Sequence, residues 1–236
     1  CSLDLIQKLI YCCMKKKIVY LLAFVLFLTN GISAFSQQKS PFQAQIEAFL
    51  KQDSLEFPPK NAILLVGSSS FTNWKDVQEY FPEHKIINRG FGGSSLPDVI
   101  RYAPNIIYPY KPAQILIYCG ENDFPSGTNT TADTIFNRFT RLHGMIRSAL
   151  PKTEIIYISM KPSVSRLKYL PEMRRANEMI RIFQKKHSKS GYIDVYSKMI
   201  LADGSPMPDI FLKDQLHMNK NGYLIWQKAI KPYLKK

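Results

Sequence analysis

The chain has 236 residues, of which 45% are hydrophobic and 21% are charged, and it carries a formal charge of +14. This composition is typical of a globular protein with one domain. A folded chain of this length buries about 70% of the surface that it exposes when unfolded, so neither a metal ion nor a disulfide is needed to hold it together.

The positive charge does not by itself indicate a nucleic-acid partner. Four lysines and one aspartate place +3 of the charge in residues 1–36, and the other +11 is spread over residues 37–236. Binding through phosphates requires a coherent basic stripe with aromatic residues that stack on bases. The sequence therefore favours a solvated basic surface over a nucleic-acid site. Weak attraction to anionic lipids or acidic glycans is the alternative.

Residues 14–36 have the layout of a secretory signal peptide. Met14 is followed by three lysines, by an apolar run over 18–28 and by the small-residue pattern Ala34-Phe35-Ser36, with cleavage expected after Ser36. The apolar run is shorter than the about 20 residues that span a bilayer, so we expect no stable membrane insertion after cleavage. A retained membrane anchor is the alternative. The sequence thus predicts export, to the periplasm or out of the cell.

The two regions on either side of this signal differ. Residues 1–13 have no initiator methionine and precede a complete signal, so we interpret them as a mis-assigned extension upstream of the true start. Residues 37–236 are predicted to form a single domain. Three of the four cysteines lie in residues 1–13, which leaves Cys119 alone in the domain. We therefore expect no internal disulfide and no Cys/His cluster with metal-binding spacing.

The domain alternates between short apolar runs and longer amphipathic ones. Strands are expected at 62–66, 85–88, 114–119, 154–159 and 192–196. Helices are expected at 42–53 and near 71–81, 95–107, 132–150, 171–188 and 221–234. Continuously apolar strands separated by helices predict a mostly parallel five-stranded sheet inside a three-layer α/β/α sandwich. In such folds the reactive groups lie in loops at the carboxyl ends of the strands.

The first strand runs into three consecutive serines, in the stretch AILLVGSSSFTNW. A serine at a strand-to-helix turn presents its hydroxyl at the rim of the sheet, and its backbone N–H lies beside the positive end of the helix. The alternative is that Ser68, Ser69 and Ser70 only cap the helix. The stretch does not match the G-x-S-x-G elbow of α/β-hydrolases, because Phe71 stands where glycine is required.

The second strand ends in a cluster of glycines, in the stretch NRGFGGSSLPDV. Gly90, Gly92 and Gly93 precede a helix that Ser94 or Ser95 would cap. Such a cluster either makes a tight turn or bares backbone N–H groups that bind negative charge. A dinucleotide fingerprint is not present, because it requires G-x-G-x-x-G after the first strand and an acidic residue about 20 residues further on.

The third strand ends in YCGENDF, where Gly120, Asn122 and Asp123 follow a buried segment directly. An asparagine at such a place commonly shapes an Asx turn. Its side-chain amide can equally donate a hydrogen bond to a developing oxyanion.

One of the four histidines lies beside both a loop and a carboxylate. Asp214 precedes His217 by three residues in the stretch FLKDQLHMNKNGY. A carboxylate in this position holds one tautomer of the imidazole and stabilises the imidazolium. His84, His143 and His187 occur in a turn, in a helical pattern and in a polar run, where surface or core positions are the expected ones.

Together the four loops resemble the SGNH, or GDSL, hydrolase superfamily, whose blocks carry serine, glycine, asparagine and aspartate–histidine in this order. The resemblance covers residues 60–235. The stretches VGSSSFTNW and YCGENDF are most similar to the branch of platelet-activating-factor acetylhydrolase-like esterases. The resemblance implies the SGNH hydrolase fold, which is flavodoxin-like.

The resemblance also implies a set of site residues. Ser69 matches the family's nucleophile, His217 its general base and Asp214 the orienting carboxylate. The backbone N–H groups of Ser69 and Gly93 and the side chain of Asn122 match the oxyanion donors. No metal or organic cofactor is implied.

The chain departs from the family at Ser68, where the family usually has aspartate. Because that aspartate is not the nucleophile, the departure affects the hydrogen bonding of the loop more than the chemistry. Lys161, Pro162 and Ser163 follow the fourth strand, and they either line the substrate pocket or pack the loop.

The resemblance implies that the protein is a serine esterase that transfers an acyl group to water. We expect short-acyl, acetyl-type esters on carbohydrate, because an exported enzyme meets glycans and does not meet the coenzyme-A esters of the cytosol. The alternatives are a lysophospholipase or a thioesterase with the same triad, or an inactive relative that binds a glycan or a lipid.

Overall fold

The computed structural model describes residues 40–127 and 129–235. From Pro41 onward the chain forms one compact unit. The interpretation of residues 1–13 as an extension and of residues 14–36 as a signal peptide lies outside the described residues.

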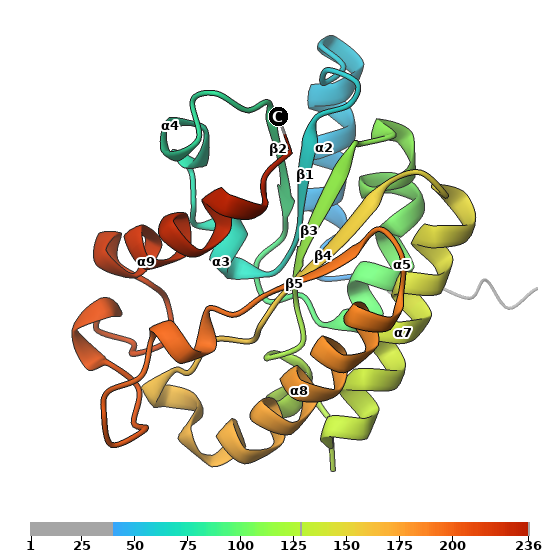
Figure 1. Cartoon of the computed structure of the whole chain (residues 1–236). Coiled ribbons are helices and arrows are strands. Elements are labelled where there is room, and N and C mark those ends of the chain that lie inside the picture. The colour runs from blue at the N-terminus through green and yellow to red at the C-terminus, as the bar shows by residue number, and fades with distance from the viewer. Residues whose placement is uncertain (1–39, 128, 236) are drawn as a thin grey trace, which may run out of the picture. The chain divides into compact units, whose positions relative to one another are not determined.

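The described residues contain five strands, which form one parallel sheet (Figure 1). Their order across the sheet is β2-β1-β3-β4-β5. Every position of β1 and β3 is buried, as expected for strands that helices cover on both sides. The predicted three-layer α/β/α sandwich is thereby confirmed. The strands are β1 (Ile63–Gly67), β2 (Ile86–Gly90), β3 (Gln114–Tyr118), β4 (Glu154–Ile158) and β5 (Ser190–Ile193).

Helices cover both faces of the sheet, and each face has its own hydrophobic core. One face carries α2 (Gln43–Leu55), α5 (Leu96–Ile106), α7 (Ala132–Ala149) and α8 (Leu170–Lys186). The other carries α3 (Ser69–Thr72), α4 (Val77–Tyr80) and α9 (Lys220–Ile230). The one-turn helix α6 (Asp123–Ser126) follows β3. Within the described part of the chain, no helix combines the length and the apolarity needed to cross a membrane.

The expectation of one helix over 71–81 is wrong, because two one-turn helices, α3 and α4, occupy this region. Between them lies Trp74, which is 1% exposed. Its ring packs on α9, with its centroid 4.9 Å from that of Tyr223 and 6.2 Å from that of Trp226. The chain turns here to bury this indole, and that contact with a distant helix is not visible in the local periodicity.

The fifth strand begins and ends earlier than the predicted range of 192–196. β5 is an edge strand whose first three residues are only partly buried, so its start carries no continuous apolar signal. Beyond Ile193, the Ser159 hydroxyl accepts the N–H groups of Val195 and Tyr196. These two hydrogen bonds turn the chain away from the sheet.

The strand order creates a switch point between β1 and β3 at the carboxyl edge of the sheet. From β1 the chain continues to β2 on one side, whereas β3 lies on the other, so the loops that follow β1 and β3 diverge. Gly67 closes β1 with a φ of 142°, and a Cβ atom there would lie 1.8 Å from the Tyr118 carbonyl oxygen. The Ser68 N–H donates to that oxygen at 3.1 Å. The serine loop, residues 68–70, is thus attached directly to the end of β3.

One buried histidine makes the stability of this fold sensitive to acid. His143 in α7 is 3% exposed, and its Nε2 lies 2.9 Å from Ser190 Oγ. Burial, with smaller contributions from the nearby Arg147 and His187, lowers the pKa of His143 from 6.5 to about 4. Between these values the unfolded chain binds more protons than the native one, so this contribution to stability is complete above the unfolded pKa and is lost as the pH falls.

We expect the free energy of unfolding to fall by up to about 3 kcal/mol between pH 7 and pH 4 through this group alone. Urea denaturation at several pH values would measure it. His143→Gln keeps a polar group near Ser190 without the ionisation, and it should show a smaller loss over the same range. An unchanged pH dependence in this variant would assign the acid sensitivity to other groups.

Candidate active site

The three serines differ sharply in exposure. Ser69 is the first residue of α3 and is partly exposed, whereas Ser68 and Ser70 are 1% and 2% exposed. The Oγ atoms of Ser68 and Ser70 are buried and have no hydrogen-bond partner among the described residues. Ser69 is therefore the one serine of this run whose hydroxyl can meet a substrate.

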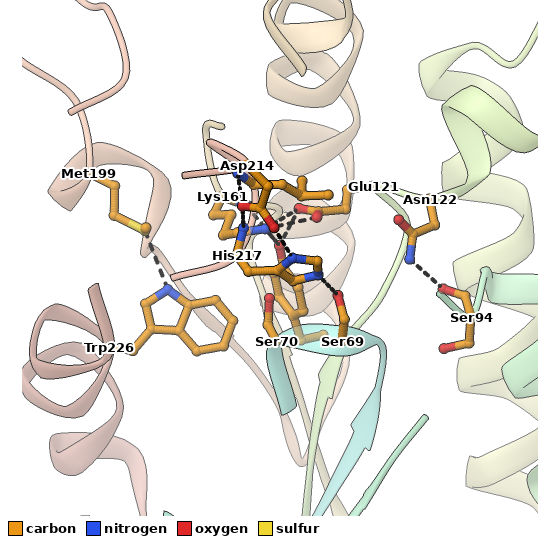
Figure 2. Close-up of polar contacts among 12 residues, drawn as sticks. Ser69, Ser70, Ser94, Glu121, Asn122, Lys161, Met199, Asp214, His217 and Trp226 are labelled. Atoms are coloured by element: carbon orange, nitrogen blue, oxygen red, sulfur yellow. Dashed lines mark hydrogen bonds and ion pairs between the residues drawn. The ribbon is translucent and has the colours of Figure 1, made fainter. Parts of the chain in front are cut away.

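The predicted histidine lies next to this hydroxyl (Figure 2). His217 stands in the loop before α9, and its Nε2 lies 3.1 Å from Ser69 Oγ, although 148 positions separate the two residues. Asp214 Oδ2 lies 2.6 Å from His217 Nδ1. The second carboxylate oxygen of Asp214 accepts the N–H groups of Leu216 and His217, both at 2.9 Å. One carboxylate thus holds the loop and the ring together.

The charge of Asp214 decides which ring nitrogen carries the proton. The hydrogen bond from the His217 ring is the largest of the effects that lower the pKa of Asp214 to about 2, and backbone hydrogen bonds add to it. At neutral pH this carboxylate is ionised and can only accept hydrogen bonds, so His217 Nδ1 is the donor. In the neutral ring Nε2 then has a free lone pair toward the Ser69 hydroxyl.

The glycine loop lies beside the serine loop. Gly93 has a φ of 82°, in the region that favours glycine, and it is exposed. Asn88 in β2 ties the two loops together, because its Nδ2 donates to the Phe71 carbonyl oxygen at 2.7 Å and its Oδ1 accepts the Gly90 N–H at 3.0 Å. The predicted block of glycines therefore reaches the same edge of the sheet as Ser69.

The structure brings Asn122 to the glycine loop. Its Nδ2 donates to the carbonyl oxygen of Ser94, the neighbour of Gly93, at 3.2 Å (Figure 2). A side-chain amide has two N–H groups, so one of them is left for another acceptor. The side chain of Asn122 is nearly buried, with 8% of the residue exposed.

The sequence did not predict the contacts that anchor the chain on either side of Asn122. The carboxylate of Asp123 accepts the Leu96 N–H at 2.9 Å and a hydrogen bond from Arg138 at 2.7 Å. Glu121 is 1% exposed and forms an ion pair with Lys161. The available signal was a charged residue at the end of each of two apolar strands, but a single sequence does not reveal that the two residues meet.

Lys161, Pro162 and Ser163 lie in the interior of the protein. All three are buried, and Lys161 and Ser163 are 0% exposed. Their burial favours the packing alternative for these residues.

The arrangement suits nucleophilic chemistry at a serine. A hydroxyl, an imidazole and an ionised carboxylate in sequence form the constellation that activates serine toward carbonyl carbon. Cys119 is no rival nucleophile, because it is 0% exposed and burial raises the pKa of its thiol well above the usual value. Among the described residues, no group of three or more His, Cys, Asp or Glu side chains is arranged to hold a metal ion.

Comparison with known proteins agrees with the geometry. The model of the GDSL-like lipase/acylhydrolase family matches residues 43–225. No curated protein matches the sequence.

Solved structures share the fold at low sequence identity. A protein from Streptococcus pneumonia, provisionally named as a platelet activating factor, matches with a TM-score of 0.71 and 19% identity over 91% of this chain and 99% of that chain. A GDSL-like lipase from Bacteroides thetaiotaomicron matches with a TM-score of 0.68 and 17% identity over 80% of this chain and 97% of that chain. A catalytic mutant of an acetylxylan esterase from Geobacillus stearothermophilus matches with a TM-score of 0.58 and 14% identity over 73% of this chain and 94% of that chain. At this identity the likeness extends to the fold alone.

Proposed function

The chain belongs to the GDSL-like lipase/acylhydrolase family and is an ester-bond hydrolase, and from this premise we propose that Ser69 is its nucleophile, His217 its general base and Asp214 the carboxylate that orients the base. One observation carries the proposal. An unbroken line of contacts runs from Asp214 Oδ2 to His217 Nδ1 at 2.6 Å and from His217 Nε2 to Ser69 Oγ at 3.1 Å.

In the first half of the reaction Ser69 Oγ attacks the ester carbonyl carbon while its proton passes to His217 Nε2. The ionised Asp214 stabilises the imidazolium that forms. The negative charge on the former carbonyl oxygen is stabilised by the N–H groups of Ser69 and Gly93 and by the Asn122 amide, each contributing roughly 10²- to 10³-fold in rate.

Acylation ends when the tetrahedral intermediate collapses and His217 gives its proton to the leaving alcohol oxygen. This leaves an acyl ester on Ser69. Water then attacks the acyl carbon and gives a proton to His217 Nε2. As the second intermediate collapses to the free acid, His217 returns this proton to Ser69 Oγ. No step of this scheme requires a metal or an organic cofactor.

The substrate class that we propose is a short-acyl ester on carbohydrate. The export predicted for residues 14–36 would bring the enzyme to glycans in the periplasm or outside the cell, away from the coenzyme-A esters of the cytosol. A fold neighbour is an acetylxylan esterase. Because fold alone does not select a substrate, the choice depends on the predicted export.

Replacing the proposed nucleophile should abolish turnover without loss of the fold. Ser69→Ala should lower kcat on p-nitrophenyl acetate by about 10⁴-fold or more, and His217→Ala should be comparably severe because a triad acts as a unit. A fluorophosphonate probe should label the wild type and not Ser69→Ala.

The buried neighbours provide matched controls for this experiment. Ser68→Ala and Ser70→Ala should keep most of the activity and of the labelling. Loss of labelling in Ser70→Ala with retention in Ser69→Ala would overturn the assignment. A wild type that neither labels nor turns over ester would indicate an inactive binding relative.

The pH dependence should report one ionisation on the acid side. A protonated His217 ring cannot accept the Ser69 proton, so kcat/KM falls as the pH is lowered. The pKa of Asp214 is about 2, so this carboxylate adds no second proton in the range where the protein is assayed. A plot of log kcat/KM against pH should therefore approach a slope of one, with circular dichroism checking the fold. A slope of two would contradict this arrangement.

The acyl preference can be read from a chain-length series of p-nitrophenyl esters, together with acetylated xylan and acetylated sialic acid. We expect kcat/KM to be highest for acetyl and to drop as the acyl chain grows, with acetate released from at least one acetylated glycan. A preference for long acyl chains or for lysophospholipid would favour a lipid substrate, and a preference for thioesters would favour a thioesterase.

A further inference from the structure

A buried ion pair lies behind the site, just beyond the ends of the neighbouring strands β3 and β4 (Figure 2). Lys161, just after β4, is 0% exposed, and its Nζ lies 2.8 and 2.9 Å from the two carboxylate oxygens of Glu121. The hydroxyl of Tyr118, the last residue of β3, donates to Glu121 at 2.5 Å. Burial, and to a lesser degree the Glu121 charge, raises the pKa of Tyr118 well above its usual value, so this hydroxyl keeps its proton.

The pair holds the chain immediately next to Asn122. Three consecutive side chains, those of Glu121, Asn122 and Asp123, are each attached to a different element. Glu121 binds the end of β4 through Lys161, Asn122 binds the glycine loop, and Asp123 binds the first N–H of α5. The Asn122 backbone therefore has a buried carboxylate as anchor on each side.

The same cluster contacts the serine loop. The carbonyl oxygen of Tyr118 accepts the Ser68 N–H at 3.1 Å, one residue before Ser69. On the other side of Lys161, the Ser165 N–H donates to the Gln215 carbonyl oxygen at 3.1 Å, within the loop that carries Asp214 and His217. A displacement of Tyr118, Glu121 and Lys161 would thus also shift the loops that carry the reactive groups.

Stability alone is a weak reason for such a pair. Removing two charges from water costs several kcal/mol per ion, and replacing a buried pair by well-packed apolar residues is often neutral or stabilising. What an ion pair supplies that apolar packing does not is direction, because both oxygens of Glu121 are held by donors at set positions.

We propose that Lys161 and Glu121 are positioning residues, which hold the Asn122 amide where it can donate to the oxyanion. This inference rests on the proposed function of Asn122 as an oxyanion donor. A donor contributes to the rate only where its N–H meets the developing charge, and a misplacement of about 1 Å can cost about 100-fold. The ion pair then acts on kcat through Asn122 and has little effect on KM.

A double-mutant cycle tests this dependence. Asn122→Ala is expected to lower kcat on p-nitrophenyl acetate about 100-fold. Lys161→Met, which keeps an unbranched side chain one atom shorter and removes the charge, is expected to lower kcat at least about tenfold with KM within about twofold. If Lys161 acts through Asn122, the double variant should lie within about threefold of Asn122→Ala, because the donor that Lys161 places is already gone.

The chain offers a matched control in a second buried ion pair with a tyrosine hydroxyl. Arg89 in β2 pairs with Asp53 of α2, with side chains 6% and 8% exposed, and its Nε donates to Tyr110 Oη at 2.7 Å. No contact of this group with Asn122 is present in the described residues. Arg89→Met should lower the thermal midpoint yet change kcat by no more than about twofold. In the Asn122→Ala background it should have the same small effect, so the two changes should combine independently.

Each outcome decides the proposal. A wild-type kcat in Lys161→Met would overturn it, and so would multiplication of the Lys161→Met and Asn122→Ala effects to about 1,000-fold.

If Lys161→Met does not fold, because it leaves Glu121 charged and unpaired, Lys161→Met/Glu121→Gln removes both charges and enters the same cycle. That variant should remain folded with a lowered kcat, and a wild-type kcat would overturn the proposal. Failure of the cycle in an enzyme that still requires Ser69 would leave the proposed function intact.

Discussion

The parallel pairing of β1 with β3 is the constraint on which the site depends. Gly67 lies opposite Tyr118 in this pairing, so the two strands end together at the carboxyl edge of the sheet. The lack of a side chain at Gly67 lets the Tyr118 carbonyl oxygen approach and accept the Ser68 N–H. The loop after β1, which carries Ser69, and the loop after β3, which carries Asn122, therefore start side by side at the place where the strand order reverses. The loop before α9 has only to reach this place for His217 to contact Ser69.

The departure from the family at Ser68 is accommodated by the backbone. Its hydroxyl has no hydrogen-bond partner in the described part of the chain, so the side chain does not organise the loop. The backbone does, because the Ser68 N–H is bound to Tyr118 and the Ser68 carbonyl oxygen accepts the N–H groups of Phe71 and Thr72. Replacing the usual aspartate thus leaves the start of α3, and with it the Ser69 hydroxyl, at the rim of the sheet.

How much the sequence could predict differs between the fold and the site. Continuous apolar runs such as 62–66 predict β1 and β3 well, because a strand buried on both faces has no polar position. The same rule placed β5 late, since an edge strand with a partly exposed start lacks that signal. The break between α3 and α4 depends on Trp74 packing against α9, about 150 residues away, which no local pattern contains. Ser69, His217 and Asp214 were predicted from their order in the chain. The structure gives the preference for Ser69 among the three serines a physical reason, because Ser68 and Ser70 are buried and Ser69 is partly exposed.

The sequence did not reveal the contact between Glu121 and Lys161, and the positions of the two residues explain why. Glu121 and Lys161 are 40 positions apart, and neither belongs to a motif that indicates a partner. Read alone, Lys161 was expected either to line the substrate pocket or to pack its loop, and Glu121 was only a charged residue at the end of an apolar strand, a type that is mostly exposed. Only the register of β3 with β4 brings the two ends together, and only burial turns two surface-like residues into a directional contact. A reactive group can be recognised from its chemical type, but the groups that hold it in place are recognised from their contacts.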